Sequence, residues 1–410
     1  MFQKPRFLLA LFLVLVLALA ACVTVEGPES DAGGDGAAAD SGEGTMDSGE
    51  SVLIIIPAEI SGGGAVPGNN WADGAKLAVE DINASGGILG HMVEYEVLDT
   101  QTDPEVSKSV IAKGLDQNPA GIFGSVYSSS TIVNMVESER AEVPQWVGSE
   151  AASITQQGHQ YIFRTSSGQS GSLPKMANYL VDEGVESVVV IYANTEFGQG
   201  GRAAAVENFI ERGIEVVAEI STEQQQADFA PEVLQALDSG AQAIFSYLTE
   251  EESARLLKEL EKQGSELPIY GEAVLLSQGV LDLAGSSANG ARGHVNLSAQ
   301  ADVPGIQEFA TKFEEAYGYV PDHNGLKGYI GVHVFKEMAE RTEGFDGPAI
   351  AEALHCALIT VEDESGVLMD LAYDEKGDID RATFLVEVQD GAQVIIGNLS
   401  RLMNTCADEG

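Results

Sequence analysis

Four consecutive hydroxyl side chains, Ser128 to Thr131, occur in the stretch GSVYSSST, between an apolar run (AGIFG) and a helical pattern (TIVNMVESER). Three roles suit such a run: a nucleophile, a helix cap, or a cradle for an anion. A nucleophile needs a base within hydrogen-bond reach, and these serines belong to neither a Gly-x-Ser-x-Gly nor a Ser-x-x-Lys motif. Hydroxyls cap helices, and helix N-termini suit carboxylates. We therefore expect Ser128 to contact an anionic ligand group while Ser129, Ser130 or Thr131 steadies the turn.

Short apolar runs alternate with amphipathic stretches of about a dozen residues from Ser51 onward, and this alternation predicts the elements that position the serines. Because strands and helices alternate in this way, we expect an α/β fold with parallel sheets, formed twice along the chain. The predicted strands are 52–56, 93–99, 120–123, 144–147, 187–192, 214–220, 241–247 and 267–271. The predicted helices are 71–84, 104–115, 131–141, 173–182, 200–212, 231–238 and 251–263.

Residues that directly follow the predicted strands are the candidates for a binding site, because ligands of such sheets bind beyond the carboxyl ends of the strands. In the first half these residues are 61–64, 125–131 and 148–150, and in the second half they are 194–197, 249–251 and 272–273. Two units of this kind that face each other would enclose a small molecule. They could close on it by a hinge motion.

The first 22 residues have the pattern of an export signal. Lys4 and Arg6 precede an apolar run that ends in Leu-Ala-Ala-Cys, so residues 1–21 resemble a lipoprotein signal peptide and Cys22 the acylated mature N-terminus. The alternative is a retained membrane helix, but the run is short for a bilayer span. Residues 23–50 contain eight acids and no basic residue, which indicates a disordered tether. We expect a protein exported and lipid-anchored at the outer face of the cell membrane.

The net charge of −43 argues against nucleic acid as a partner and against a direct contact with anionic lipid.

Beyond Cys22, only Cys356 and Cys406 remain, and they could form a disulfide or stay as two buried thiols. DEKGDID (374–380) lacks the spacing of a calcium loop and indicates a hairpin turn. No cofactor or metal motif follows a strand, so we expect neither a cofactor nor an enzyme. The six histidines are scattered: His91, His159, His294, His323, His333 and His355.

Several strings match one known family in order. AVEDINASGGILG (78–90) resembles a signature of the type I periplasmic binding proteins, in particular the branched-chain amino acid-binding group of ABC transporters. Within it, Asn83 can help to end the helix and Gly86 and Gly87 can adopt positive φ. Further pieces follow at family spacing: LDTQTDP (98–104), GSVYSSST (124–131), QYIFRTSS (160–167), VIYANTEFGQG (190–200) and YDEKGDI (373–379).

The resemblance implies two Rossmann-like lobes joined by three hinge crossovers, near 164–170, 294–296 and 378–383. It also implies helices at 308–317 and 325–343 that return to the first lobe and a final strand at 384–389 in the second. It gives an N-terminal lobe of 51–167 plus 296–380 and a C-terminal lobe of 168–295 plus 381–405. Residues 1–21 form the signal peptide in this division, and 22–50 are the acylated cysteine and tether. The ligand cleft lies between the lobes.

Ligand contacts carry over from the resemblance residue by residue. Ser128 stands where the family holds the amino acid carboxylate, with Ser129 beside it, and Phe197 where an aromatic side chain covers the ligand. The remaining implied contacts are Gly148, Ser149, Glu150, Thr249 and Glu272, with Trp71, Tyr127 and Ala273 as further cleft candidates. The sequence departs from the family pattern at Pro67, Glu150, Thr249 and Ala273.

Four acids follow strands: Glu150, Glu196, Glu250 and Glu272. We expect Glu150 and Glu272 to face the cleft, where an acid would pair with an ammonium, and the other two to be solvated. Two acids in the cleft would suggest a ligand more positively charged than leucine. Phe197 is expected to stack on the ligand, while Trp71 could be either a lid or a packing residue.

The function implied is that of a solute-binding lipoprotein of an ABC importer, which captures a branched-chain amino acid or a related small polar compound. It would close on the ligand and deliver it to a permease and its ATPase, as a monomer. A sensor of the same fold for amino acids, amides or urea is the alternative, and an exported hydrolase is a third hypothesis.

Overall fold

The computed structural model describes residues 49, 51–400 and 406. The predicted signal peptide, Cys22 and all of the acidic tether except Gly49 lie outside the described residues. Among the residues described, no helix has both the length and the apolar character needed to cross a bilayer. The description below therefore concerns the α/β part of the chain.

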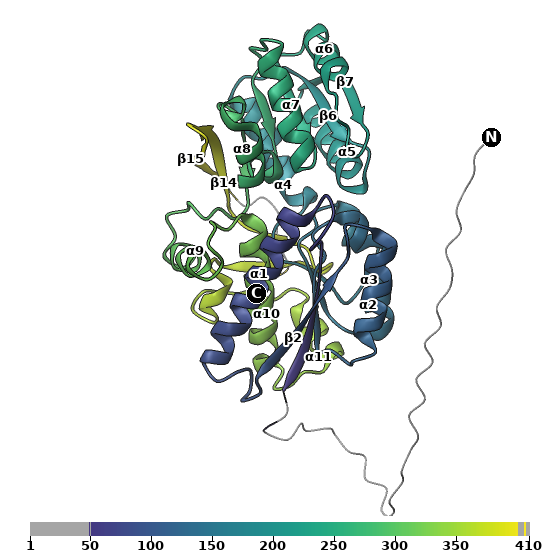
Figure 1. Ribbon diagram of the computed structural model, residues 1–410, viewed down its shortest axis with the longest axis vertical. Helices are drawn as coiled ribbons and strands as arrows, with labels where there is room; N and C mark the ends of the chain where they lie inside the picture. The colour runs from purple at the N-terminus through teal and green to yellow at the C-terminus, as the bar shows by residue number, and fades with distance from the viewer. Residues whose placement is uncertain (1–48, 50, 401–405, 407–410) are drawn as a thin grey trace, which may run out of the picture. The chain divides into compact units, whose positions relative to one another are not determined.

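The first sheet has five parallel strands in the order β2-β1-β3-β4-β5. Its central strand β1 has the sequence VLIIIPA and is almost wholly buried, as expected for a parallel strand covered on both faces. The strands are β1 (Val52–Ala58), β2 (Val93–Asp99), β3 (Gly121–Phe123), β4 (Gln145–Val147) and β5 (Ile162–Arg164). Helices α1 (Ala65–Ala84), α2 (Pro104–Leu115) and α3 (Ser128–Ala141) lie with this sheet (Figure 1). We call this body the first lobe.

The second sheet has seven strands in the order β15-β14-β10-β9-β8-β6-β7, parallel from β10 to β7 and antiparallel at β14 and β15. The strands are β6 (Ser187–Ala193), β7 (Glu215–Thr222), β8 (Ala243–Tyr247), β9 (Ile269–Gly271), β10 (Arg292–Val295), β14 (Thr383–Gln389) and β15 (Ala392–Leu399). The helices are α4 (Gln169–Asp182), α5 (Glu196–Glu211), α6 (Ala230–Asp238), α7 (Glu250–Lys262) and α8 (Gln278–Ala284). This body is the second lobe, in the upper part of Figure 1.

The chain returns to the first lobe after β10. There it forms α9 (Pro304–Tyr317), α10 (His323–Arg341), α11 (Gly347–Leu354) and a small sheet of β11 (Leu358–Ile359), β12 (Leu371–Tyr373) and β13 (Ile379–Asp380). Helix α10 packs along α1 so closely that a Cβ at Gly328 would lie 2.2 Å from the carbonyl oxygen of Trp71. Short 3-10 turns are η1 (Ala152–Ile154), η2 (Ala273–Leu276), η3 (Gly285–Ala288) and η4 (Ser365–Val367).

The predicted fold class, two α/β lobes joined by three crossovers, is confirmed. Several helices begin earlier than predicted: α1 at Ala65 and not at 71, α3 at Ser128 and not at 131, α4 at Gln169 and not at 173, and α5 at Glu196 and not at 200. Helix α1 starts early because Pro67 is acceptable in a first turn, where its missing N–H would have no partner. Several short elements were not predicted as strands, among them β5, β10, β11 to β13 and the outer strand β15.

The turn after α1 behaves as its sequence indicates. Gly86 and Gly87 have φ of 106° and 80°, and a Cβ at Gly87 would lie 2.0 Å from the carbonyl oxygen of His91. The Asn83 side chain donates to Val93 O at 2.9 Å and accepts from Val93 N at 2.8 Å. These contacts tie the end of α1 to the start of β2.

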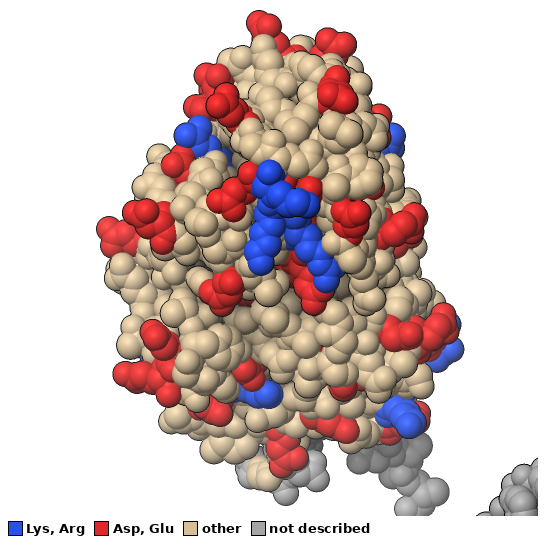
Figure 2. Space-filling model, turned by 45° about the horizontal axis from the view of Figure 1, so that its top comes forward, with Lys and Arg blue, Asp and Glu red and all other residues tan. Residues whose placement is uncertain are grey.

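Two open questions from the sequence have answers in the structure. Cys356 and Cys406 form a disulfide, with Cα atoms 5.2 Å apart. DEKGDID forms the predicted hairpin, because β12 and β13 pair antiparallel on either side of the turn. The surface carries many acids, while Lys and Arg side chains are few and gather near the middle of the face in Figure 2.

Candidate functional site

The N-terminus of α3 forms the first part of a pocket between the lobes. Its N-cap is Tyr127, whose side chain makes no capping bond. Within the hydroxyl run, Thr131 steadies the turn, because its Oγ1 donates to Ser125 O at 3.4 Å. The backbone amides of Val126 and Tyr127 donate to the buried carboxylate of Glu59, each at 3.3 Å. Burial raises the Glu59 pKa to about 7.

The amides of Ser128 and Ser129 are among the first-turn groups without an intrahelical acceptor, since the first helical bond runs from Thr131 N to Tyr127 O. Ser128 Oγ accepts a hydrogen bond from Ala151 N at 3.2 Å. The pocket edge at this point therefore offers hydrogen-bond donors suited to an anion.

The loop after β4 forms the next part of the wall. A Cβ at Gly148 would lie 2.8 Å from the indole ring of Trp71, so only glycine fits here. Trp71 is fully buried and donates from Nε1 to Phe123 O at 2.9 Å, which makes it a packing residue behind the pocket. Ser149 also points away from the pocket, donating from Oγ to Thr131 Oγ1 at 2.9 Å.

Glu150 lines the pocket, and the structure gives it a partner that the sequence did not indicate. Lys327 of α10 donates from Nζ to Glu150 Oε1 at 2.7 Å and to Gly148 O at 3.2 Å, with both charged side chains buried. Because Lys327 compensates its charge, Glu150 is not a free acid for a ligand ammonium.

The first turn of α10 brings two more side chains to the same wall, His323 and Asn324. Asp322 caps this helix by accepting from Asn324 N at 2.7 Å and Gly325 N at 3.3 Å. Burial, with Lys327 nearby, lowers the pKa of His323 well below its usual value, so the imidazole is neutral. The only sequence signal for this turn is the capping Asp before the helical pattern, and this signal does not indicate that the turn reaches the pocket.

The second lobe supplies the opposite wall from residues at the carboxyl ends of its strands: Thr195, Phe197, Gln224, Thr249, Glu250 and Val274. Phe197 packs on Tyr247 with ring centroids 4.6 Å apart. Thr249 caps α7 together with Glu252. The apolar face of Phe197 and the cap of α7 thus stand across from the α3 N-terminus.

Glu250 is the pocket acid without a basic partner among the described residues. Its Oε2 accepts from the Tyr127 hydroxyl at 3.3 Å, a contact that joins the two lobes. Burial raises the pKa of Glu250 to about 7. An ammonium group beside this carboxylate would supply the missing counter-charge and favour its ionised form.

Seven of the predicted site residues line one pocket, which is partly open to solvent. The seven are Tyr127, Ser128, Ser129, Gly148, Glu150, Phe197 and Thr249. The prediction missed His323, Asn324, Lys327 and Gln224. Thr195 and Glu250 fall in the predicted strand-end ranges 194–197 and 249–251, but neither was singled out as a ligand contact.

Glu272 and Ala273 are buried beside the pocket wall and do not line the pocket. Glu272 Oε1 accepts from Val274 N at 3.0 Å, and its Oε2 has no hydrogen-bond partner among the described residues. Burial, with Glu150 nearby, raises the pKa of Glu272 well above its usual value. Glu272 therefore sits behind Val274 as a neutral carboxyl group.

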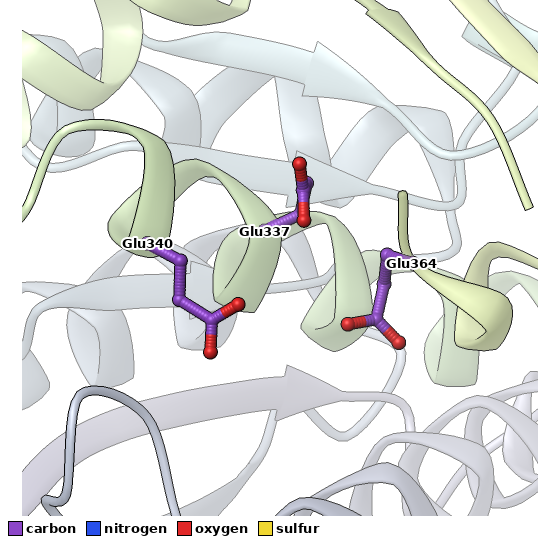
Figure 3. Close-up of side chains that lie close together, drawn as sticks. All are labelled: Glu337, Glu340 and Glu364. Atoms are coloured by element: carbon purple, nitrogen blue, oxygen red, sulfur yellow. The ribbon is translucent and has the colours of Figure 1, made fainter. Parts of the chain in front are cut away.

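A separate acidic group, Glu337, Glu340 and Glu364, brings carboxylate oxygens close together on α10 and the turn before η4 (Figure 3). These acids already have basic partners. Lys336 joins Glu340 at 3.1 Å and Glu364 at 2.5 Å, and Arg341 pairs with Glu337 at 2.6 Å. The group is an ion-pair network that fixes α10 to the following segment.

Two α/β lobes with a pocket at the carboxyl ends of their strands define a two-lobed solute-binding fold. The sequence profile described as "Periplasmic binding protein" matches residues 56–393. The chain belongs to this family and is of the type I kind that resembles branched-chain amino acid binders.

Named relatives support this assignment. Leu/Ile/Val-binding protein homolog 7 of Brucella abortus is 26% identical over 367 residues, covering 82% of this chain and 88% of the relative. The leucine-binding protein LivK of Thermotoga maritima has a TM-score of 0.78 at 21% identity, covering 85% of this chain and 99% of its own.

Two further solved structures contain different ligands. LivJ of Streptococcus pneumoniae, in complex with isoleucine, has a TM-score of 0.76 at 19% identity and covers 86% of this chain and 99% of its own. A solute-binding protein of R. palustris, in complex with benzoate, has a TM-score of 0.78 at 17% identity, covering 86% and 97%. At these identities the likeness shows the fold, and each ligand belongs to its own protein.

Proposed function

We propose that this protein captures a free amino acid outside the cytoplasm and delivers it to an ABC permease. The observation that supports this most directly is the pocket between the lobes, with first-turn amides of α3 on one side and the unpaired Glu250 on the other. The two walls offer partners for the two charges of a zwitterion. Phe197, Val126 and Val274 give the side chain an apolar contact.

Charge distinguishes an amino acid from an aromatic acid as the ligand. The pocket lining contains the acids Glu150 and Glu250 and one base, Lys327, which is already bound to Glu150. Benzoate could use the α3 amides but would leave Glu250 without a counter-charge. An amino acid provides an ammonium for it, and that pairing strengthens when the lobes exclude water.

Calorimetry with L-isoleucine, L-leucine and L-valine against benzoate and 4-hydroxybenzoate tests the proposal. We expect the amino acids to bind and the aromatic acids not to bind. Glu250→Gln should weaken amino acid binding at least tenfold, because a charge-assisted bond becomes a neutral one. Glu251→Gln is the matched control, since Glu251 lies one residue further on α7 and does not line this pocket. Tight binding of benzoate with no binding of amino acids would contradict the proposal.

The anchoring and the lobe boundaries derived from the sequence belong to the same proposal. Residues 1–21 would be removed, Cys22 acylated, and 22–50 would tether the lobes to the membrane. The lobes would consist of 51–167 plus 296–380 and of 168–295 plus 381–405, as a monomer. The mass of the mature N-terminal peptide tests this directly: an unmodified Cys22 peptide would show that the lipid is absent.

A further inference from the structure

Gln169 occupies the first position of α4, just after the chain leaves β5 of the first lobe. It is fully buried, although glutamine is usually an exposed residue type. The burial of this amide therefore requires that its hydrogen-bonding groups be satisfied.

Three polar groups of Gln169 bond to the loops that form the pocket walls. Its backbone N donates to Glu150 O at 3.0 Å. Its side-chain Oε1 accepts from Ala152 N at 3.1 Å, and its Nε2 donates to Phe197 O at 2.8 Å. Glu150 and Ala152 belong to the first lobe, whereas Phe197 belongs to the second. One side chain thus bridges the ligand-facing loops of both lobes.

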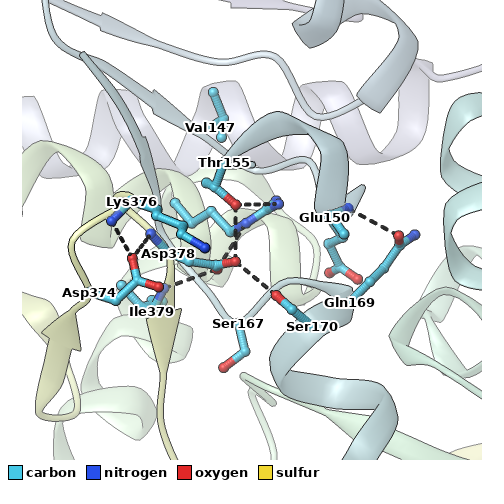
Figure 4. Close-up of polar contacts among 12 residues, drawn as sticks. Val147, Glu150, Thr155, Ser167, Gln169, Ser170, Asp374, Lys376, Asp378 and Ile379 are labelled. Atoms are coloured by element: carbon cyan, nitrogen blue, oxygen red, sulfur yellow. Dashed lines mark hydrogen bonds and ion pairs between the residues drawn. The ribbon is translucent and has the colours of Figure 1, made fainter. Parts of the chain in front are cut away.

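The neighbourhood of Gln169 keeps its backbone in place. Asp378 accepts from Ser170 Oγ at 2.9 Å and from Thr155 Oγ1 at 3.1 Å, and it pairs with Arg164 Nε at 2.9 Å. Figure 4 shows Gln169 beside Glu150 at the edge of this polar network. These bonds tie the start of α4 to first-lobe residues, so the hydrogen bond from Gln169 Nε2 to Phe197 O is the one that reaches into the body of the second lobe.

The Gln169 amide packs closely against Gly200 of α5. A Cβ at Gly200 would lie 2.5 Å from Gln169 Oε1. A methyl group at position 200 would therefore push the amide away from Ala152. Gly200 gives a second, independent way to disturb the bridge without removing Gln169.

We propose that Gln169 is a positioning residue that holds the two lobes in their closed arrangement, in the ligand-free protein as well as in the complex. Opening the lobes separates Ala152 from Phe197, so at least one of the two side-chain bonds must break. Each bond retained in the closed arrangement biases the equilibrium toward it. This inference rests on the proposed function, because closure matters for capture of a ligand.

The variant Gln169→Glu keeps the shape and the acceptor for Ala152 N, and in its ionised form it has no proton to donate to Phe197 O. Gln157→Glu is the matched control, since Gln157 is exposed and bonds only within its own turn, to Ser153 O. Gly200→Ala should act in the same direction as Gln169→Glu. Circular dichroism and thermal melting would establish that each variant folds.

Small-angle scattering of the ligand-free proteins provides a readout that a merely structural role would not change. We expect a larger radius of gyration for Gln169→Glu and Gly200→Ala than for wild type and Gln157→Glu. With L-leucine as the probe, the first two should bind about tenfold more weakly through faster dissociation. Folded Gln169→Glu with the wild-type radius would overturn the inference. Failure of every protein to bind L-leucine would count against the proposed ligand class, and the ligand-free radii would still decide the role of Gln169.

Discussion

Glu150 and Glu250 are both acids of the pocket wall, but their surroundings give them different roles. Glu150 pairs with a buried lysine at 2.7 Å, whereas Glu250 accepts from a tyrosine hydroxyl at 3.3 Å. A buried ion pair is costly to break from one side, because the remaining charge stays uncompensated. Lys327 is therefore a residue on which both the stability of the first lobe and the charge of the pocket depend.

Replacing Lys327 by methionine should lower the free energy of unfolding of the ligand-free protein by roughly 3 kcal/mol, since it leaves Glu150 buried without a partner. Urea denaturation measures this. Lys312→Met provides the comparison, because Lys312 is 43% exposed and pairs with Asp81 and Glu308 at the surface. That change should cost less than about 1 kcal/mol. Equal losses in the two variants would show that the Lys327–Glu150 pair has no special weight.

At the scale of elements, the sequence predicts the long strands and helices well because their apolar residues repeat with a clear period. It does not predict the three-residue strand β5 or the outer strand β15, which alternates exposed and half-buried residues. The same distinction applies to the site residues: some could be predicted from the sequence and others could not. Residues that follow a predicted strand, such as Ser128, Glu150, Phe197 and Thr249, could be found from the chain order. His323 and Lys327 could not, since α10 reaches the pocket only through its packing on α1.

The disulfide connects two elements of the fold and gives a prediction at this scale. Cys356 and Cys406 are separated by 50 positions, so the crosslink restricts a large part of the unfolded chain. In the chain-entropy account, reduction should lower the free energy of unfolding by up to about 4 kcal/mol. Denaturation with and without dithiothreitol checks this, with Cys356→Ser as the control that reductant should not affect. Identical midpoints for the oxidised and reduced wild type would contradict it.

For the whole molecule, the buried acids make stability depend on pH. Burial raises the pKa of Glu59 and Glu250 to about 7 and that of Asp322 to about 6. Such groups bind protons more tightly in the folded chain than in the unfolded one. Their stabilising contribution is therefore complete below the unfolded pKa of about 4 and is lost as the pH rises through the folded value. Glu364 acts oppositely, but its pKa of about 2 places its effect at lower pH. Burial lowers the pKa of His294 to about 3 and that of His323 well below its usual value, so these two groups offset part of the loss below the unfolded histidine pKa of about 6.5.

The free energy of unfolding of the ligand-free protein should accordingly fall between pH 5 and pH 7.5, by roughly 1–3 kcal/mol for each of these groups. Urea titrations across this range measure the slope. Glu59→Gln should flatten it, whereas the exposed Glu80→Gln should leave it unchanged. A stability that rises across the same range would mean that the buried acids are ionised in the folded protein.

The disulfide has a mechanical consequence as well. Cys356 follows α11 in the first lobe, and the chain between the two cysteines passes through β14 and β15 of the second lobe before it reaches Cys406. A closed covalent ring therefore runs through both bodies. If the chain is stretched from its two ends, the 50 residue steps of the ring stay out of the extension, a length of about 170 Å at full stretch. The disulfide carries the pulling force past β14 and β15. Those strands are therefore shielded from a pull that would otherwise peel them from the sheet edge.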